Sequence, residues 1–191
     1  MPRLPRHRHF RAAALALAVI ASAFAGPAAA SEQSLEYAVK ATYLYKLAPF
    51  VEWPAHAHDP QTGTIDLCVV GEDPFGDTLD RAVAGQQLGG RPFAVRRMRV
   101  LDPRARCHVM FLGGSAAQTA DALRMARGMP VLTVTDAVAD PAAMGIVNFV
   151  VVDGRVRFEI DAAAAAQNGI AISSKLLDLA VAVHRGGETP R

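Results

Sequence analysis

The chain has 191 residues, 51% of them hydrophobic and 20% charged, and this composition excludes a disordered protein. Its formal net charge is +2 at pH 7, and the small basic excess lies in the first residues, where arginines occur without any acidic residue. The charge therefore gives no support for nucleic-acid binding, which needs a basic surface on the folded domain.

Residues 1–30 predict a secretory signal peptide. A basic head precedes an apolar run over residues 12–25, and the small-residue triplet 28–30 forms an Ala-x-Ala cleavage site before Ser31. An uncleaved membrane anchor is the alternative, but the apolar run is short and rich in alanine, whereas a membrane span takes about 20 strongly apolar residues. We therefore expect a mature chain of residues 31–191 outside the cytoplasm, in an oxidising setting where disulfides form.

The expected mature chain has the length of one domain, in which predicted strands and helices alternate. Helices are expected at residues 35–48, 77–84 and 115–127, between Asp161 and Asn168, and from Ser173 or Ser174 to about His184. Strands are expected at residues 65–70, 92–100, 107–112, 131–134, 146–152 and 155–160.

Short joints marked by glycine connect these elements, a pattern typical of a parallel sheet covered by helices on both faces. The predicted fold is therefore an α/β, Rossmann-like sandwich of three layers with a mostly parallel sheet. Asp153-Gly154 lies between two β-rich runs and favours a type I′ hairpin, which adds an antiparallel edge near the C-terminus. The aromatic-rich residues 50–54 are expected to pack on the core.

The chain also resembles a known family in the order of its motifs. These motifs are residues 37–45 (YAVKATYLY), 50–54 (FVEWP), 67–76 (LCVVGEDPFG), 90–92 (GRP), 107–111 (CHVMF), 131–136 (VLTVTD), 157–160 (RFEI) and 173–177 (SSKLL). Together they resemble the YfiR-like family over almost the whole expected mature chain, from Tyr37 to about Val183. The resemblance implies an α/β sandwich that acts as a periplasmic regulator.

The best understood class of this family binds the periplasmic sensor domain of an inner-membrane diguanylate cyclase and holds the cyclase inactive. An OmpA-type outer-membrane lipoprotein can sequester the regulator. The resemblance therefore implies these two proteins as partners, and a second copy of the chain is a further candidate.

Cys68 and Cys107 are the only cysteines, and two cysteines in an oxidising compartment usually pair. We expect a structural disulfide, with two buried free thiols as the alternative. Both positions also match a cysteine pair of the family. Some relatives carry a second pair around the hairpin, but residues 144–152 of this chain contain no cysteine. A redox switch that needs the second bridge is therefore not expected.

The segment Gly71 to Gly76 follows a predicted strand and precedes a predicted helix, the place where open α/β sheets bind ligands. Gly71, Asp73, Pro74 and Phe75 are therefore candidates for a small-ligand crevice. The alternative is an Asp-Pro turn followed by a packing glycine. A dinucleotide is not expected, because the segment lacks the glycine fingerprint and Glu72 and Asp73 would repel a pyrophosphate.

Arg96, Arg97 and Arg99 lie together on one predicted strand. They are candidates for a basic patch that binds an acidic partner surface or an anionic ligand. An edge strand that is protected from aggregation by its charge is the alternative.

No motif predicts catalysis, a cofactor or a metal. His56, His58 and Asp59 lie on a polar loop, and with Cys107-His108 they match no zinc spacing. Ser173 and Ser174 lack the Ser-x-x-Lys spacing because position 172 is Ile172, so they are expected to cap a helix.

These observations predict a non-enzymatic periplasmic repressor of a membrane diguanylate cyclase. The alternative is a periplasmic small-ligand-binding domain that acts on another signalling protein.

Overall fold

A computed structural model of the protein describes residues 27–57 and 63–186. The chain divides into two units, residues 1–34 and 35–191. In the first unit, residues 27–34 form the start of helix α1 (Pro27–Leu47), so this helix begins before the expected residue 35. The basic and apolar parts of the expected signal peptide lie outside the described residues. The second unit contains the rest of α1 and all other elements.

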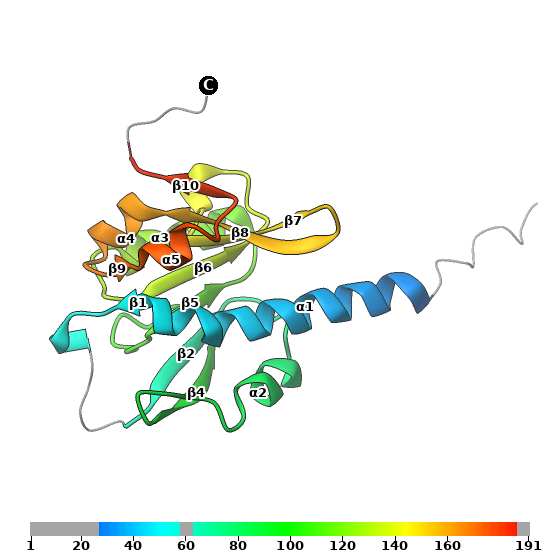
Figure 1. Cartoon of the computed structure of the whole chain (residues 1–191), viewed down its shortest axis with the longest axis horizontal. Helices are drawn as coiled ribbons and strands as arrows, with labels where there is room; N and C mark the ends of the chain where they lie inside the picture. The colour runs from blue at the N-terminus through cyan, green and yellow to red at the C-terminus, as the bar shows by residue number, and fades with distance from the viewer. Residues whose placement is uncertain (1–26, 58–62, 187–191) are drawn as a thin grey trace, which may run out of the picture. The chain divides into compact units, whose positions relative to one another are not determined.

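The second unit is built on an eight-stranded sheet with the order β10-β8-β7-β6-β5-β2-β4-β3 (Figure 1). The pairs of β2 with β4, β2 with β5, β5 with β6, β6 with β7 and β8 with β10 are parallel, which confirms the α/β class and the mostly parallel sheet. The strands are β2 (Ile65–Val70), β3 (Gln87–Leu88), β4 (Arg91–Met98), β5 (Val109–Leu112), β6 (Leu132–Asp136), β7 (Val147–Val152), β8 (Arg155–Asp161) and β10 (Ala182–His184).

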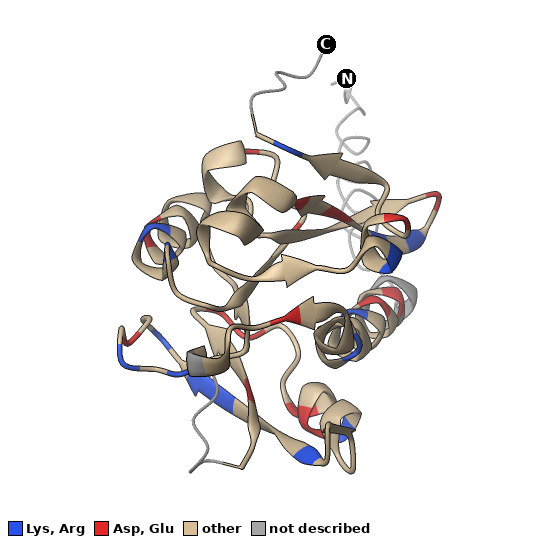
Figure 2. Ribbon diagram, turned by 60° about the vertical axis from the view of Figure 1, so that its left-hand side comes forward, with Lys and Arg blue, Asp and Glu red and all other residues tan. Residues whose placement is uncertain are grey.

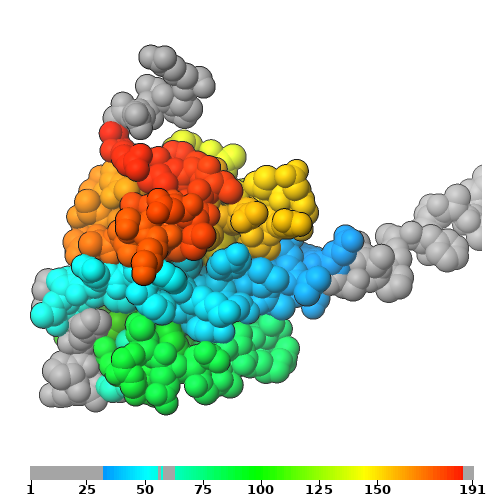
Figure 3. All heavy atoms as spheres, viewed as in Figure 1, coloured from blue at the N-terminus to red at the C-terminus, as the bar shows by residue number. Residues whose placement is uncertain are grey.

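Every residue of β2 is buried, since neighbouring elements cover both sides of the sheet. On one side, Leu67 and Val69 belong to the larger apolar core, into which residues 35–47 of α1, α2 (Asp77–Val83), α4 (Ala162–Gln167) and α5 (Ser174–Leu177) also pack. On the other side, Cys68 and Val70 pack with residues of α3 (Ala116–Ala126). Figure 3 shows residues 35–47 of α1 (blue to cyan) between α2 (green) and the C-terminal elements (orange to red).

Local signals produce the starts of α3 and α4 and the hairpin turn as expected. Ser115 and Gln118 form a reciprocal capping box at the start of α3, and the Asp161 carboxylate accepts a hydrogen bond from Ala164 N at the start of α4. Asp153 and Gly154 have φ angles of 50° and 69°, as a type I′ turn between β7 and β8 requires.

The expectation of a helix from Ser173 or Ser174 to about His184 is wrong. Helix α5 ends at Leu177, and residues 182–184 form β10, which pairs in parallel with β8. Strand β8 would otherwise leave the N–H and C=O groups of its outer edge without hydrogen-bond partners in the sheet. Residues 182–184 pair with this edge as a strand, and Val183 lies opposite Ile160. The hairpin is consequently inside the sheet, so its expected place at the edge is also wrong.

A small second sheet joins two segments that the sequence did not predict as strands. In this sheet β1 (Val51–Glu52) pairs antiparallel with β9 (Ala171–Ile172). Strand β1 begins directly after the 3-10 turn Ala48–Phe50, which contains Pro49 and follows the end of α1 at Leu47. The aromatic exit of α1 does contact the core, as Phe50 and Trp53 pack against the larger cluster.

Candidate functional site

The strand order reverses beside β2, because the chain leaves β2 toward β4 and then returns on the other side as β5. Such reversal points are the places where open α/β sheets bind ligands, at the carboxyl ends of the strands. Here Gly71 follows β2 and Gly113 follows β5. A Cβ atom on Gly71 would lie 2.2 Å from the carbonyl oxygen of Gly113, so the two loops meet backbone to backbone. The loops that follow β2 and β5 are therefore in direct backbone contact at the carboxyl edge.

The predicted crevice residues after Gly71 form an ordered turn. One oxygen of the Asp73 carboxylate accepts hydrogen bonds from the backbone N–H groups of Phe75 and Gly76, at 2.8 and 3.2 Å. Pro74 lies between Asp73 and Phe75 and is partly buried. The side chain of Phe75 is 4% exposed and packs edge-on against Phe111, with 4.7 Å between ring centroids. The side chain of Phe75 therefore occupies the space beside the strand-order reversal on the α1 side of the sheet.

Helix α1 adds a cluster of charged and aromatic side chains on the same side. The Tyr37 ring lies 5.7 Å from that of Phe75, and the Lys40 ammonium lies 4.8 Å from the centroid of the Tyr37 ring. Lys40 is 2% exposed and donates to Glu36 and, at 2.6 Å, to Asp136 at the end of β6. Glu36 and Lys40 are four residues apart on one helix, but no local signal indicated that Asp136 joins them.

This cluster shifts the pKa values of two of its members. Burial disfavours the charged form of Lys40, but hydrogen bonds to Asp136 and Glu36 outweigh it, so the pKa of Lys40 is raised. Burial and the negative charge of Asp136 raise the pKa of Tyr37. Lys40 is therefore charged at neutral pH and bound to two carboxylates, which suits a structural contact better than proton transfer.

The strand β4 divides its arginines between its two sides, as neighbouring residues of a strand must. Arg97 contacts Asp73 at 2.6 Å and Asp80 of α2 at 2.5 Å, and its hydrogen bond to Asp80 lowers the pKa of that carboxyl. Arg96 lies on the α3 side, where its Nε is 3.2 Å from Asp66. Arg99 follows the strand, is exposed, and forms no ion pair with any described residue.

The structure thus brings Asp73 and Arg97, from two separate predictions, into one ion-pair network. Basic positions mark β4 in Figure 2 (blue), but Arg96, Arg97 and Arg99 do not form one continuous patch. Binding of an acidic partner by these arginines stays a prediction.

On the α3 side, a pocket of about 210 Å³ opens at the same carboxyl edge. Val70 and Leu112 contribute from the ends of β2 and β5, Arg99 and Val100 from the segment after β4, and Ala122 from α3. Of the predicted crevice residues, Gly71 lines this pocket, whereas Asp73, Pro74 and Phe75 do not.

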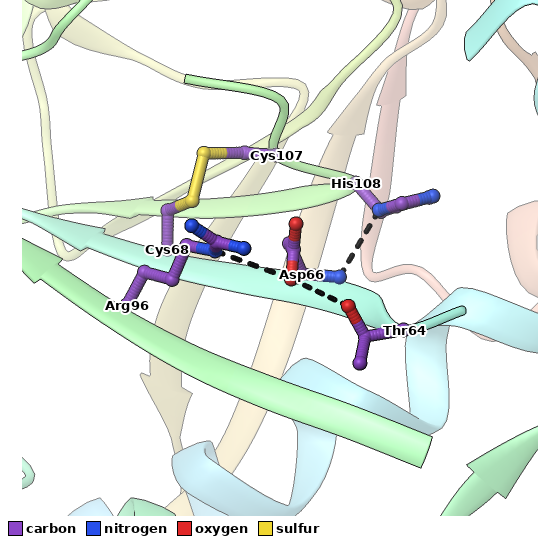
Figure 4. The surroundings of a disulfide bond; sticks show 6 residues. All are labelled: Thr64, Asp66, Cys68, Arg96, Cys107 and His108. Carbon is purple, nitrogen blue, oxygen red and sulfur yellow. Dashed lines mark hydrogen bonds and ion pairs between the residues drawn. A yellow bond between two sulfur atoms is a disulfide. The ribbon is translucent and has the colours of Figure 1, made fainter. Parts of the chain in front are cut away.

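Cys68 of β2 and Cys107 are joined by a disulfide whose Cα atoms are 5.8 Å apart (Figure 4). Beside it lies a polar cluster that the sequence did not indicate. The buried Asp66 carboxylate accepts from Thr64 Oγ1 at 2.9 Å and pairs with Arg96, and Asp66 N donates to His108 Nδ1 at 3.1 Å. An aspartate within an otherwise apolar strand was the available signal, because a buried charge needs a partner.

The remaining candidate chemistry has little geometric support. His58 and Asp59 lie outside the described residues, and within the described ranges no group of three metal-ligating side chains gathers. Ser173 Oγ accepts from Leu176 N and caps α5. No helix within residues 27–57 and 63–186 has the length and apolar character needed to cross a membrane.

The fold and this edge define an α/β protein whose sheet reversal point is filled on one side and open on the other. A family model described as YfiR/HmsC-like matches residues 37–181. The chain belongs to the YfiR/HmsC-like family, in agreement with the order of its motifs. No curated protein matches the chain in a sequence comparison.

Proposed function

We propose that this protein is a periplasmic regulator that binds the periplasmic sensor domain of an inner-membrane diguanylate cyclase and represses the cyclase. The observation that carries the proposal is the YfiR/HmsC-like match over residues 37–181, since that family is one of periplasmic regulators of diguanylate cyclase signalling. Regulation without catalysis is consistent with the paired state of Lys40, Asp136 and Asp73, which leaves these groups engaged in structural contacts.

The expected location agrees with this role. Residues 1–30 have the order of a secretory signal peptide, and the Cys68–Cys107 disulfide suits a protein that folds in an oxidising compartment. Repression itself requires differential affinity. The regulator must bind the inactive conformation of the sensor domain more tightly than the active one, because equal affinity for both would shift no population.

The proposal is tested in the native host by deleting the gene and measuring intracellular cyclic-di-GMP. We expect its level to rise on deletion and to return when the full-length chain is supplied in trans. Crosslinking of the periplasm, followed by purification of the tagged protein, should recover a membrane protein with a diguanylate cyclase domain.

A chain that lacks residues 1–30 is the matched control. It keeps the described domain from residue 31 onward but should stay in the cytoplasm and fail to lower cyclic-di-GMP. Equal complementation by the leaderless chain, or an unchanged cyclic-di-GMP level on deletion, would refute the proposal. The OmpA-type lipoprotein and a second copy of the chain are further partners that the same crosslinking experiment identifies by mass.

The second candidate function is that of a small-ligand-binding domain acting on another signalling protein. The pocket of about 210 Å³ beside Gly71 favours it, because that pocket lies at the sheet reversal point. Recovery of a signalling protein without a cyclase domain in the crosslinking experiment would favour this candidate.

A further inference from the structure

The pocket on the α3 side of the carboxyl edge has the construction of a ligand site. Its walls come from three separate parts of the chain, namely the strand ends at Val70 and Leu112, the segment 99–101 after β4, and helix α3. All of these residues belong to the second unit. Leu101 is 3% exposed, whereas Val100 and Met125 are 74% and 46% exposed, so apolar side chains continue from the wall to the solvent.

Three of the lining positions, Gly71, Gly113 and Ala122, carry little or no side chain. Gly71 and Gly113 must be glycine, since their Cβ atoms would overlap the backbone of the facing loop at 2.2 and 2.0 Å. Ala122 of α3 faces the same space with a single methyl group. Gly71, Gly113 and Ala122 therefore contribute no side chain larger than a methyl group to the lining of the pocket.

The lining of the pocket carries one basic side chain, Arg99, and one acidic side chain, Asp121. Arg99 lines it and forms no ion pair with a described residue. Asp121 also lines it, but its carboxylate is engaged by Arg124 one turn further along α3. A guanidinium without a carboxylate partner, next to apolar walls, is suited to an anion that has an apolar body, because arginine binds carboxylates through two parallel hydrogen bonds.

The size of the pocket limits the ligand. Sites for drug-sized molecules have volumes of roughly 300–1,000 Å³, so about 210 Å³ holds a smaller molecule. We infer that this pocket binds a small carboxylate with a compact aromatic or branched aliphatic body, with Arg99 on the carboxylate and the side chains of Val70, Leu101 and Ala122 around the apolar body. This site does not depend on which partner the protein regulates.

The test uses 3-phenylpropionate as the probe and the neutral 3-phenylpropan-1-ol as its control, added to the protein secreted into the periplasm of an expression host. Amide shifts in ¹H–¹⁵N spectra report both the affinity and the place of binding. We expect saturable shifts at Gly71, Gly113 and residues 119–125, with a dissociation constant between about 0.1 and 10 mM for a ligand of this size.

Two variants separate the site from non-specific binding. Arg99→Gln should weaken binding of the carboxylate by about tenfold or more and leave the alcohol unaffected, because a charge-assisted hydrogen bond is lost. Arg104→Gln makes the same change at an exposed position outside the pocket and should have no effect. Ala122→Leu should fill the pocket and abolish binding of both probes, while the spectrum shows that the fold is kept.

Three results would overturn the inference. The first is the absence of saturable shifts with the carboxylate, and the second is equal affinity for acid and alcohol. The third is a set of shifts centred away from the pocket, for example around the Cys68–Cys107 bridge. A cyclic-di-GMP phenotype with no ligand binding would leave the proposed regulator intact and reject the ligand site alone.

Discussion

Lys40 Nζ of α1 lies 2.6 Å from Asp136 Oδ1 at the end of β6, across 96 residues of sequence. Lys40 is 2% exposed, so this contact ties the helix to the carboxyl edge of the sheet through a buried charge pair. Buried pairs contribute little net stability when complete, but loss of one partner leaves an uncompensated charge. The contact therefore acts mainly on the position of α1.

Replacement of Lys40 by methionine should lower the free energy of unfolding by about 3 kcal/mol, because Asp136 would remain charged at a largely buried position. The double variant Lys40→Met/Asp136→Leu should recover most of this loss. Urea denaturation of the purified protein measures both. Lys46→Met, at an exposed position of the same helix, is the control and should change stability by less than about 0.5 kcal/mol. A loss of similar size in Lys46→Met would show that the effect is one of helix propensity.

The raised pKa of Lys40 sets the pH range over which this side chain contributes to the stability of the folded protein. A lysine whose pKa is higher in the folded than in the unfolded protein stabilises fully below its ordinary value of 10.5, and the contribution disappears as the pH rises through the folded value. The stability difference between the wild type and Lys40→Met should therefore be constant from neutral pH up to 10.5 and narrow above it. A difference that already narrows near neutral pH would contradict the pairing.

Removal of the disulfide by Cys68→Ala/Cys107→Ala should lower the free energy of unfolding by about 4 kcal/mol. The bridge joins residues 39 positions apart, and closing such a loop restricts the unfolded chain. Thermal unfolding of the oxidised wild type, the reduced wild type and the double variant measures the loss. The reduced wild type should resemble the double variant, and labelling of the denatured, non-reduced protein should detect no thiol. Two reactive thiols in that assay would disprove the bridge.

Replacement of Gly71 by alanine should cost about 3 kcal/mol or more, because its φ of +86° disfavours a side chain and its Cβ would meet Gly113 O. Gly128→Ala is the matched control. Its φ is +78°, nothing lies within 4 Å of its Cβ, and its cost should be about 1 kcal/mol. Chemical denaturation compares the two. Equal costs would mean that backbone conformation alone, and not the approach of the two loops, requires glycine at position 71.

Replacement of Arg97 by glutamine should move the pKa of Asp80 back up toward its ordinary value of 3.8, since the Arg97 guanidinium lowers it. Carboxyl chemical shifts followed by NMR during an acid titration measure this change. Asp80 is about half exposed, so the accompanying loss of stability should be only about 1 kcal/mol. Because the folded pKa is lowered, this contribution is present above pH 3.8 and is lost as the pH falls through the folded value. Arg99→Gln should leave the Asp80 titration unchanged, and an equal shift there would contradict the ion pair.

Much of the fold was predictable because its signals are local. The six apolar residues of β2, the Ser115 cap of α3, the Asp161 cap of α4 and the Asp153-Gly154 turn each depend on side chains a few residues apart. The short strand β10 was not predictable, because residues 182–184 are equally compatible with a helix. The open edge of β8 decides the conformation of this segment.

The candidate site also combines features that the sequence predicted with features that only the folded structure determines. The sequence placed Gly71 at the carboxyl end of a strand, where ligands bind, but it could not show on which side of the sheet a pocket opens. That outcome depends on Phe75 turning toward Phe111 and Tyr37 on one side, and on the small residue Ala122 facing the strand ends on the other. Arg96 and Arg97 are neighbours in sequence but lie on opposite sides of β4, each with a different aspartate.

The order of motifs determined the family, and the alternation of strands and helices determined the α/β class. Each motif, strand and helix is a short segment, so its signal comes from residues that are close together along the chain. The tertiary structure alone decided that Lys40 is buried against Asp136, that β10 completes the sheet, and that the pocket lies beside Arg99. Each of these depends on contacts between residues far apart in sequence, and their energy is gained only when the whole chain is folded.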